Sequence, residues 1–309
     1  MEPTHLGGKI AVVTGATRGT GRSIARALAA AGATVYCTGR SAKGHVSPMN
    51  RPETVEQTVA AIRGEGGKAH TLQVDHTNEQ QTRFAVDRII EQEGKLDILV
   101  NDIWGGDGAM EWGTAFEETN LKASWNAIEN CLYSHLATTK LALPALKNSK
   151  GRIICVTDGT NLRYRGQIYY DLVKNAVIRL AYAFHQEGKQ HGVTAASVTP
   201  GFLRSEAMLD HFGVTEANWK DATATDPNFI ASETPLFLGR ALAAWLADPS
   251  TMLDGTCTSS WELGRRYGIR DADGTQPDWG KHWTDTFPSA GSPDGTEVPW
   301  ECIAPHNIP

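Results

Sequence analysis

The stretch KIAVVTGATRGTG, residues 9–21, decides the fold of this chain. Its first six residues form a short, mainly apolar run with β-branched side chains, which is typical of a buried parallel strand. Glycines follow at positions 15, 19 and 21, and then an amphipathic, alanine-rich helix is predicted over residues 22–31. Glycines let the backbone turn sharply and approach a ligand, while N–H groups at a helix N-terminus bind phosphate oxygens. The stretch therefore predicts a strand, turn and helix that bind a dinucleotide.

The rest of the chain repeats the alternation of strand and helix. Further strands are predicted at residues 33–38, 69–74, 96–100, 151–156, 193–198 and 256–260. Helices are predicted at residues 53–64, 79–93, 124–145, about 170–190 and 235–247. This alternation predicts an α/β fold, a three-layer, doubly wound parallel sheet (Rossmann-like) of about seven strands. We expect a single domain over residues 1–264.

Three segments depart from this alternation. Residues 41–52 are polar, with glycine and two prolines, and read as an insertion beside the adenosine end of a dinucleotide site. Residues 202–234 form a long irregular stretch of the kind that often covers a substrate. Residues 265–309 are rich in Pro and Gly and hold three Trp. We expect this extension to pack on its own domain or on a neighbouring subunit.

Composition narrows the class of protein. Of 309 residues, 40% are hydrophobic and 21% charged, and no apolar run reaches the roughly 18 residues of a membrane-spanning helix. The N-terminus lacks the pattern of a signal peptide, which predicts a cytoplasmic protein. The net charge of -6, with no cluster of Lys and Arg, argues against nucleic-acid binding. The five cysteines are widely spaced, without the spacing of a disulfide framework or a zinc site, so no metal is expected.

The end of the second strand bears on the choice of dinucleotide. In such folds this strand presents an acid to the ribose 2′-hydroxyl or a base to a 2′-phosphate. Here Arg40 ends the strand, and Arg18 lies in the glycine turn. Guanidinium groups pair well with phosphate, so NADP is favoured over NAD. The alternative is that either Arg only solvates a loop.

A second informative stretch, residues 151–174, runs from a strand through a polar loop into a helix with Tyr170 and Lys174. Positions i and i+4 share one helix face, so both side chains can serve one site. A cation beside a phenol lowers its pKa from about 10, which would make Tyr170 a proton donor or acceptor. Alternatively, the two form an ordinary, partly exposed pair.

Together these motifs resemble the short-chain dehydrogenase/reductase family over about residues 8–262. The likeness is carried, in chain order, by the glycine turn, Asn101 at a strand end, Asn130 inside a helix, Tyr170 with Lys174, and Pro200-Gly201. It implies a Rossmann-like fold and hydride transfer. It also implies that Tyr170 is the general acid/base, that Lys174 lowers its pKa and holds the nicotinamide ribose, and that Asn130 organises a proton-relay water.

The resemblance further implies which residues contact the cofactor and the substrate. For the cofactor these are Gly15, Thr17, Arg18, Gly19, Gly21, Arg40, Asp75, His76, Asn101, Lys174, Pro200, Gly201, Leu203 and Ser205. Aromatic and polar residues near the catalytic pair are expected to line the substrate pocket, namely Trp104, Trp112, Thr160 and Tyr164.

Two departures from the family pattern matter. The segment after the fourth strand reads Asn101-Asp-Ile-Trp104, so bulky residues stand where small ones are usual. The catalytic Ser is replaced by Asp158. An ionised carboxylate only accepts hydrogen bonds, opposes a developing oxyanion and pushes the Tyr pKa upward against Lys174.

Three interpretations of Asp158 stay open. In the first, Asp158 is protonated in an apolar pocket and acts as a hydrogen-bond donor. Alternatively, Thr157 or Thr160 supplies the hydroxyl, and Asp158 faces backbone N–H groups. In the third, the substrate carries a cationic or amine group that pairs with Asp158.

The sequence thus predicts an NADP(H)-dependent oxidoreductase that moves a hydride between nicotinamide and a carbonyl or alcohol carbon of a small molecule, with catalytic residues Tyr170, Lys174, Asn130 and Asp158. Two alternatives are a dinucleotide-binding protein with little redox activity, acting as a sensor or in assembly, and a reductase of imine or amine substrates. The resemblance implies a homodimer or homotetramer.

Overall fold

The computed structural model describes residues 5–46, 50–160 and 164–287. Seven parallel strands form one sheet in the order β3-β2-β1-β4-β5-β6-β7. The strands are β1 (Ile10–Thr14), β2 (Thr34–Gly39), β3 (Lys68–Gln73), β4 (Ile98–Asn101), β5 (Arg152–Val156), β6 (Thr194–Thr199) and β7 (Asp254–Ser259). The predicted fold class, a doubly wound parallel sheet of about seven strands, is confirmed.

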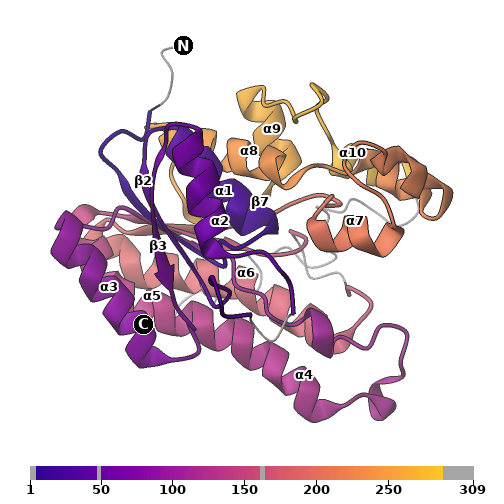
Figure 1. Ribbon diagram of the computed structural model, residues 1–309, viewed down its shortest axis with the longest axis horizontal. Coiled ribbons are helices and arrows are strands. Elements are labelled where there is room, and N and C mark those ends of the chain that lie inside the picture. Colours follow the sequence, from indigo (N-terminus) through magenta and orange to yellow (C-terminus); the bar gives the residue numbers. More distant parts are fainter. Residues whose placement is uncertain (1–4, 47–49, 161–163, 288–309) are drawn as a thin grey trace.

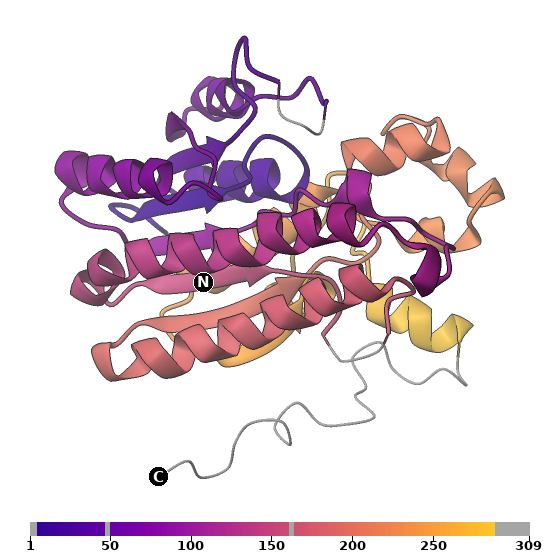
Figure 2. The same ribbon diagram turned by 90° about the horizontal axis from the view of Figure 1, so that it is seen from below.

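Helices cover both faces of the sheet (Figure 1). One face carries α1 (Gly19–Ala30), α2 (Val55–Gly64) and α8 (Pro235–Ala247); the other carries α3 (Glu79–Glu93), α5 (Ser134–Ser149) and α6 (Ile168–Gly188). Figure 2 shows α5 and α6 side by side along the sheet. A separate apolar core fills each interface, because the buried strands alternate their side chains between the two faces.

The helix predicted over residues 124–145 is interrupted. It consists of α4 (Leu121–Ile128), a π-helical turn (Glu129–Tyr133) and α5. Asn130 lies in the π-helical turn. Such turns widen the helix and are frequent at functional sites. The apolar periodicity of the sequence gave no sign of the interruption.

Residues 202–234, expected to be irregular, hold a helix, α7 (Glu206–Phe212), and two 3₁₀ turns (Trp219–Ala224 and Pro227–Ala231). They fold around the buried ring of Phe229, which packs against Trp219 and Phe212. Further 3₁₀ turns cover Asp107–Ala109, Phe116–Glu118 and Lys189–His191.

Two more helices follow β7, α9 (Ser260–Tyr267) and α10 (Trp279–Thr286). The described part of the predicted extension thus includes a helix that sequence periodicity did not indicate. Residues 288–309 of that extension and 47–49 of the predicted insertion lie outside the described residues. None of the described helices is both long and apolar enough to cross a membrane.

Candidate active site

A cavity of about 860 Å³ lies at the carboxyl edge of the sheet. β1 pairs with β2 on one side and with β4 on the other, so the connections diverge at this point. Ligands bind at such a switch point in open parallel sheets. Most of the predicted site residues line the cavity: Gly15, Thr17, Arg18, Gly19, Arg40, Asp75, His76, Trp104, Asn130, Asp158, Tyr170, Lys174, Pro200, Gly201, Leu203 and Ser205.

The Asn101 side chain does not line the cavity, and a contact between Asn101 and the cofactor stays a prediction. Asn101 is fully buried, and its Nδ2 donates to Thr139 Oγ1 at 3.0 Å, on the α5 side of the sheet. Successive residues of a strand point to opposite faces, so the next residue, Asp102, lines the cavity instead. The strand end was identified correctly, but the side chain that faces the site is one position further on.

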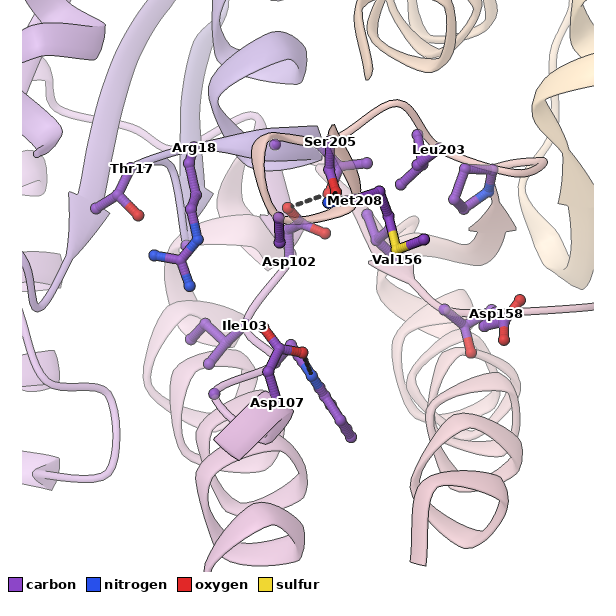
Figure 3. Close-up of a pocket in the computed structure, with 18 of the residues that line it drawn as sticks. Thr17, Arg18, Asp102, Ile103, Asp107, Val156, Asp158, Leu203, Ser205 and Met208 are labelled. Atoms are coloured by element: carbon purple, nitrogen blue, oxygen red, sulfur yellow. Dashed lines mark hydrogen bonds between the residues drawn. The ribbon is translucent and has the colours of Figure 1, made fainter. Parts of the chain in front are cut away.

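The glycine turn has the conformation that its sequence indicated. Gly15 adopts a φ of 73°, and a Cβ there would run into the backbone oxygen of Asp102. Gly21 does not line the cavity; it packs against the Gly15 carbonyl and the Asp102 carboxyl group. The turn therefore brings the N-terminus of α1 to the cavity, with Thr17 and Arg18 at its rim (Figure 3), and the Gly19 N–H there donates to Glu206 Oε2 at 2.9 Å.

The side chain of Asp102 places a carboxyl group beneath the glycine turn. Its Oδ2 accepts a hydrogen bond of 2.7 Å from Thr20 Oγ1. Burial raises the pKa of Asp102 to about 7, although the Thr20 hydrogen bond and the charge of Lys174 oppose that rise. This rise favours the neutral carboxyl group, which would limit its repulsion of a phosphate.

The Arg40 side chain, which follows the end of β2, points into the cavity. Its Nη1 lies 3.4 Å from Asn130 Oδ1, and Asn130 Nδ2 donates to the Gly105 carbonyl at 3.2 Å. Asn130 therefore ties Arg40 to the segment after β4. That Asn130 organises a proton-relay water stays a prediction.

Asp75 and His76 differ in what they offer a ligand. The Asp75 carboxylate accepts from the backbone N–H and the hydroxyl of Thr77 at the rim of the cavity. The His76 ring lies in the core, with Nε2 at 2.7 Å from Thr38 Oγ1 and Nδ1 at 2.9 Å from Thr138 Oγ1. Burial lowers the pKa of His76 to about 3, so the ring is neutral. Any contribution of His76 to an adenine edge would come from its backbone.

Tyr170 and Asp158 form the central contact of the site. The Tyr170 hydroxyl donates to Asp158 Oδ2 at 2.9 Å. The pKa of Tyr170 is raised well above its usual value, first by burial, then by the charge and hydrogen bond of Asp158, while Arg165 lowers it. The upward effect of Asp158 on this pKa is the one expected from the sequence. That Lys174 lowers the pKa of Tyr170 stays a prediction.

Lys174 nevertheless lies close to the pair. Its Nζ is 4.5 Å from the centroid of the Trp104 ring and 5.3 Å from that of Tyr170. These are distances at which a cation is attracted to an aromatic face. The predicted i, i+4 arrangement thus brings both side chains into one cavity.

In the second interpretation of Asp158, the hydroxyl group near the substrate comes from Thr157 or Thr160. The structure argues against Thr157. The Thr157 hydroxyl donates to the Lys174 carbonyl at 2.8 Å and is buried, so it faces α6 and not the cavity. The Asp158 carbonyl accepts from Arg165 Nε at 2.6 Å, which fixes the loop after β5. Asp158 itself, and not Thr157, presents the polar group beside Tyr170.

The predicted substrate residues separate into two groups. Trp104 and Trp112 contact the Tyr170 ring, each with ring centroids 5.2 Å apart. Trp112 lies outside the cavity lining, as do Thr160 and Tyr164, and the Tyr164 side chain is 62% exposed. Only Trp104 of this group is part of the cavity wall.

Several lining residues were missed by the sequence reasoning. Glu206, Met208 and His211 come from α7, and Trp279 and Trp283 come from α10. For the residues of α10, the sequence gave one indication, which is the presence of three Trp in a Pro- and Gly-rich segment, where Trp is unusual. Within the described residues, no group of His, Cys, Asp or Glu is arranged to hold a metal ion.

Comparison with known proteins agrees with this geometry. A family model described as short chain dehydrogenase matches residues 9–212. Dehydrogenase/reductase SDR family member 1 of Mus musculus is 33% identical over 277 residues, covering 86% of this chain and 84% of the relative. L-fucose dehydrogenase of Bos taurus is 29% identical over 271 residues, covering 84% and 92%.

A solved structure shows the same fold. Hydroxysteroid dehydrogenase from Escherichia coli superposes with a TM-score of 0.68 at 22% identity, covering 84% of this chain and 97% of that chain. The family match covers the glycine turn, Asp158 and the Tyr170–Lys174 pair alike. The chain therefore belongs to the short-chain dehydrogenase/reductase family of oxidoreductases, which use NAD(P) cofactors.

Proposed function

We propose that this protein is an NADP(H)-dependent oxidoreductase acting on a carbonyl or alcohol carbon, with Tyr170 exchanging the proton. The observation that carries the proposal is the position of the Tyr170 hydroxyl and of Lys174 in the cavity that begins at the glycine turn. Binding, orientation and proton transfer are the protein's contributions in such a reaction.

The residues present fit a phosphorylated dinucleotide. The N-terminus of α1 would offer backbone N–H groups to a pyrophosphate, and Arg18 lines the cavity beside it. Arg40, whose Nη1 lies 3.4 Å from Asn130 Oδ1, would leave that contact to bring its guanidinium group to a 2′-phosphate. Pro200, Gly201 and Leu203 would lie beside the nicotinamide, and Lys174 beside its ribose. When bound, the cofactor supplies or accepts the hydride at the substrate carbon.

The raised pKa of Tyr170 bears on direction. A phenol that stays protonated at neutral pH is ready to donate a proton to a substrate oxygen, which suits reduction. Alcohol oxidation needs the ionised phenol as base, and Asp158 disfavours that form. We therefore propose that reduction is the faster direction at neutral pH.

A second candidate follows from the contact between Asp158 and Tyr170. A carboxylate at the position of the reacting oxygen opposes an oxyanion but stabilises a cation. The reduction of an imine passes through or starts from a protonated nitrogen, for which this environment is favourable. Reduction of an imine or of an amine-bearing substrate is the candidate that the 2.9 Å contact favours.

One assay distinguishes these candidates. The purified protein is mixed with NADPH and matched aldehydes, ketones and cyclic imines, and the loss of NADPH absorbance is followed. Turnover of carbonyl compounds would support the first proposal, and turnover of imines alone the second. Tight NADPH binding without turnover of any compound would instead indicate a dinucleotide-binding protein with little redox activity.

Replacement of Arg40 by Ala tests the choice of cofactor. A charge-assisted hydrogen bond to phosphate contributes about 1.5–3 kcal/mol, so the Kd for NADPH should rise by about tenfold to a hundredfold. The Kd for NADH should change little. Arg83→Ala on the exposed surface of α3 is the matched control, since Arg83 contacts only Glu79 across one helix turn. Equal loss for both cofactors would contradict a role in binding the 2′-phosphate.

Glu206 competes with the cofactor for the N-terminus of α1. Its Oε2 accepts from the Gly19 N–H at 2.9 Å, and its Oε1 lies 3.8 Å from Arg22 Nη1. This is the position where the pyrophosphate is expected, and two anions cannot share one donor. Binding of the dinucleotide therefore requires the Glu206 carboxylate to leave.

Replacement of Glu206 by Gln should tighten NADPH binding. Removing an anion from a helix N-terminus changes the energy by about 0.3–1 kcal/mol, and the lost repulsion adds to this, so the Kd should fall about three- to tenfold. Isothermal titration measures it. Asp210→Asn is the control on the same helix, because Asp210 pairs with Arg51 and leaves Gly19 untouched. Unchanged or weaker binding would show that Glu206 does not compete.

We also propose that the protein assembles as a homodimer or homotetramer through its long helices. Large apolar side chains are exposed there, Trp125 by 59%, Leu136 by 47% and Leu172 by 53%. Exposed apolar patches of this kind mark interaction surfaces. The buried thiols of Cys37, Cys131 and Cys155 fit the proposed cytoplasmic location, where thiols stay reduced.

A further inference from the structure

Helix α10, which lies beyond the strands of the dehydrogenase fold, reaches the cavity. Trp279 and Trp283 are four residues apart and therefore share one helix face. Both line the cavity, and their ring centroids are 5.9 Å apart. Trp279 also packs edge-on against Phe202 at 5.7 Å, and its Cβ lies against Gly201. The two indoles thus border the turn that is expected to hold the nicotinamide.

Close contacts hold α10 in this position. Gly280 is buried against the indole of Trp261, where any larger side chain would clash. Asp278 caps the helix by accepting from the Lys281 N–H at 2.9 Å and pairs with Arg265. These contacts come from α9, so α10 rests on the core of the domain.

The opposite side of α10 is tied to the loop over the cavity. His282 Nε2 lies 3.2 Å from Asn228 Oδ1, and Asn228 lines the cavity. The chain between α9 and α10 is fixed by Asp271, which accepts from the Thr234 N–H at 2.8 Å and pairs with buried Arg204 at 3.3 Å. The extension and residues 202–234 therefore form one wall.

The chemistry of this wall is mainly aromatic at the end away from Arg18 and Arg40. Phe202, Met208, Trp279 and Trp283 provide apolar surface, and Trp104, which contacts the Tyr170 ring, also lines the cavity. Flat aromatic walls bury flat apolar ligands well, because large ring surfaces leave water together. Polar side chains, among them Asp226 and Asn228, also line the cavity, but the aromatic residues themselves offer little to the hydroxyl groups of a small polyhydroxylated substrate.

We propose that Trp279 and Trp283 determine the substrate specificity of the active site, and that they bind the flat, apolar ring system of a cyclic carbonyl compound. This inference rests on the proposed oxidoreductase function. The indoles would contact the ring system of the substrate, so they act on recognition and orientation, while Tyr170 acts on the proton.

The test compares two substrates in one assay of NADPH oxidation. One is a rigid cyclic ketone of two or more fused rings, and the other a short aliphatic aldehyde. Trp283→Ala should lower kcat/KM for the ring ketone about tenfold to a hundredfold, mostly through KM, because a lost apolar contact of this size changes discrimination by that order. The value for the aldehyde should change less than about threefold.

Two further variants keep the result interpretable. Lys281→Ala, on the exposed face of the same helix, should leave both substrates unchanged, since Lys281 contacts Asp285 at the surface. Trp283→Phe keeps an aromatic ring and should recover most of the ring-ketone activity. The Kd for NADPH, measured for every variant, shows that the fold and the cofactor site are intact.

The outcomes separate this inference from the function on which it rests. If the unaltered protein oxidises NADPH with neither class of carbonyl compound, the proposed function fails and the inference with it. If it reduces both, but the Trp variants affect the two substrates equally or not at all, the function stands and the inference is overturned.

Discussion

Replacement of Tyr170 by Phe is expected to remove turnover while NADPH still binds. The substitution deletes one hydroxyl, the group that we propose donates the proton to the substrate oxygen. General acid catalysis of this kind contributes about 10²–10⁴-fold, so kcat should fall by at least that range. Stopped-flow fluorescence gives NADPH binding, and steady-state assays give kcat for each variant.

The neighbouring residue provides a matched control. The Tyr169 hydroxyl lies 3.2 Å from Thr119 Oγ1, and its ring is buried on the other side of α6, so it does not line the cavity. Tyr169→Phe removes the same atom one residue away and should retain nearly full activity. Turnover by the Tyr170→Phe protein at the unaltered rate would show that the proton travels by another route.

The fold was predictable because its signals are local and redundant. Each apolar run of four to six residues with a glycine or polar residue at its end became a parallel strand, and each amphipathic run between them became a helix. The helices α7 and α10 were not predicted, and neither was the π-helical turn at Glu129–Tyr133, since widening a helix by one residue leaves apolar periodicity almost unchanged.

The site was predictable where a motif fixes the backbone, and less so where it depends on side-chain direction. The glycine turn and the Tyr170–Lys174 spacing led to the cavity. Asn101 and His76 were placed at the right strand ends, but their side chains turn into the core. A shift of one residue reverses the face of a strand, and the sequence does not state which residue is last in register.

The remaining lining residues come from segments without periodic signals. Glu206 reaches the N-terminus of α1 from more than 180 residues away in sequence. Trp279 reaches Gly201 because α10 docks on α9 through Gly280. Contacts of this kind depend on how separate elements pack, and a single sequence carries no pattern that reports them.

The electrostatics of the cavity differ between its two ends. Arg18 lies at the glycine turn, where Asp102 and Glu206 also line the cavity, while Asp158 lies at the opposite end (Figure 3). There it accepts from the Tyr170 hydroxyl, and Lys174 lies close by. A phosphorylated dinucleotide would place its anionic groups at the basic end. The reacting carbon would then lie next to a carboxylate, so we expect Asp158 to influence the proposed proton transfer by Tyr170.

Replacement of Asp158 by Ser should therefore increase oxidation of alcohols at neutral pH. Two of the three influences that raise the pKa of Tyr170 most, the charge and the hydrogen bond of Asp158, disappear in this variant, and the pKa falls. Alcohol oxidation requires the ionised phenol, so its rate rises as the pH passes upward through this pKa. The rising limb of the pH profile should move to lower pH.

The size of the gain follows from the shift. Below both pKa values, each unit by which the pKa falls increases the ionised fraction about tenfold. A serine hydroxyl can also donate to a substrate carbonyl, which a carboxylate cannot, so reduction of ketones should rise as well. Initial rates of both directions across the pH range measure the two effects separately.

Asp158→Asn separates charge from shape. The amide keeps the size of the carboxyl group and an oxygen that accepts from Tyr170, but it carries no charge. If the Coulomb effect dominates, the Asn variant shifts the pH profile nearly as far as the Ser variant. If neither variant moves the pH profile, the influence assigned to Asp158 on the pKa of Tyr170 is contradicted. If both variants lose imine reduction and neither gains activity on neutral ketones, the enzyme uses the Asp158 carboxylate to bind a cationic substrate.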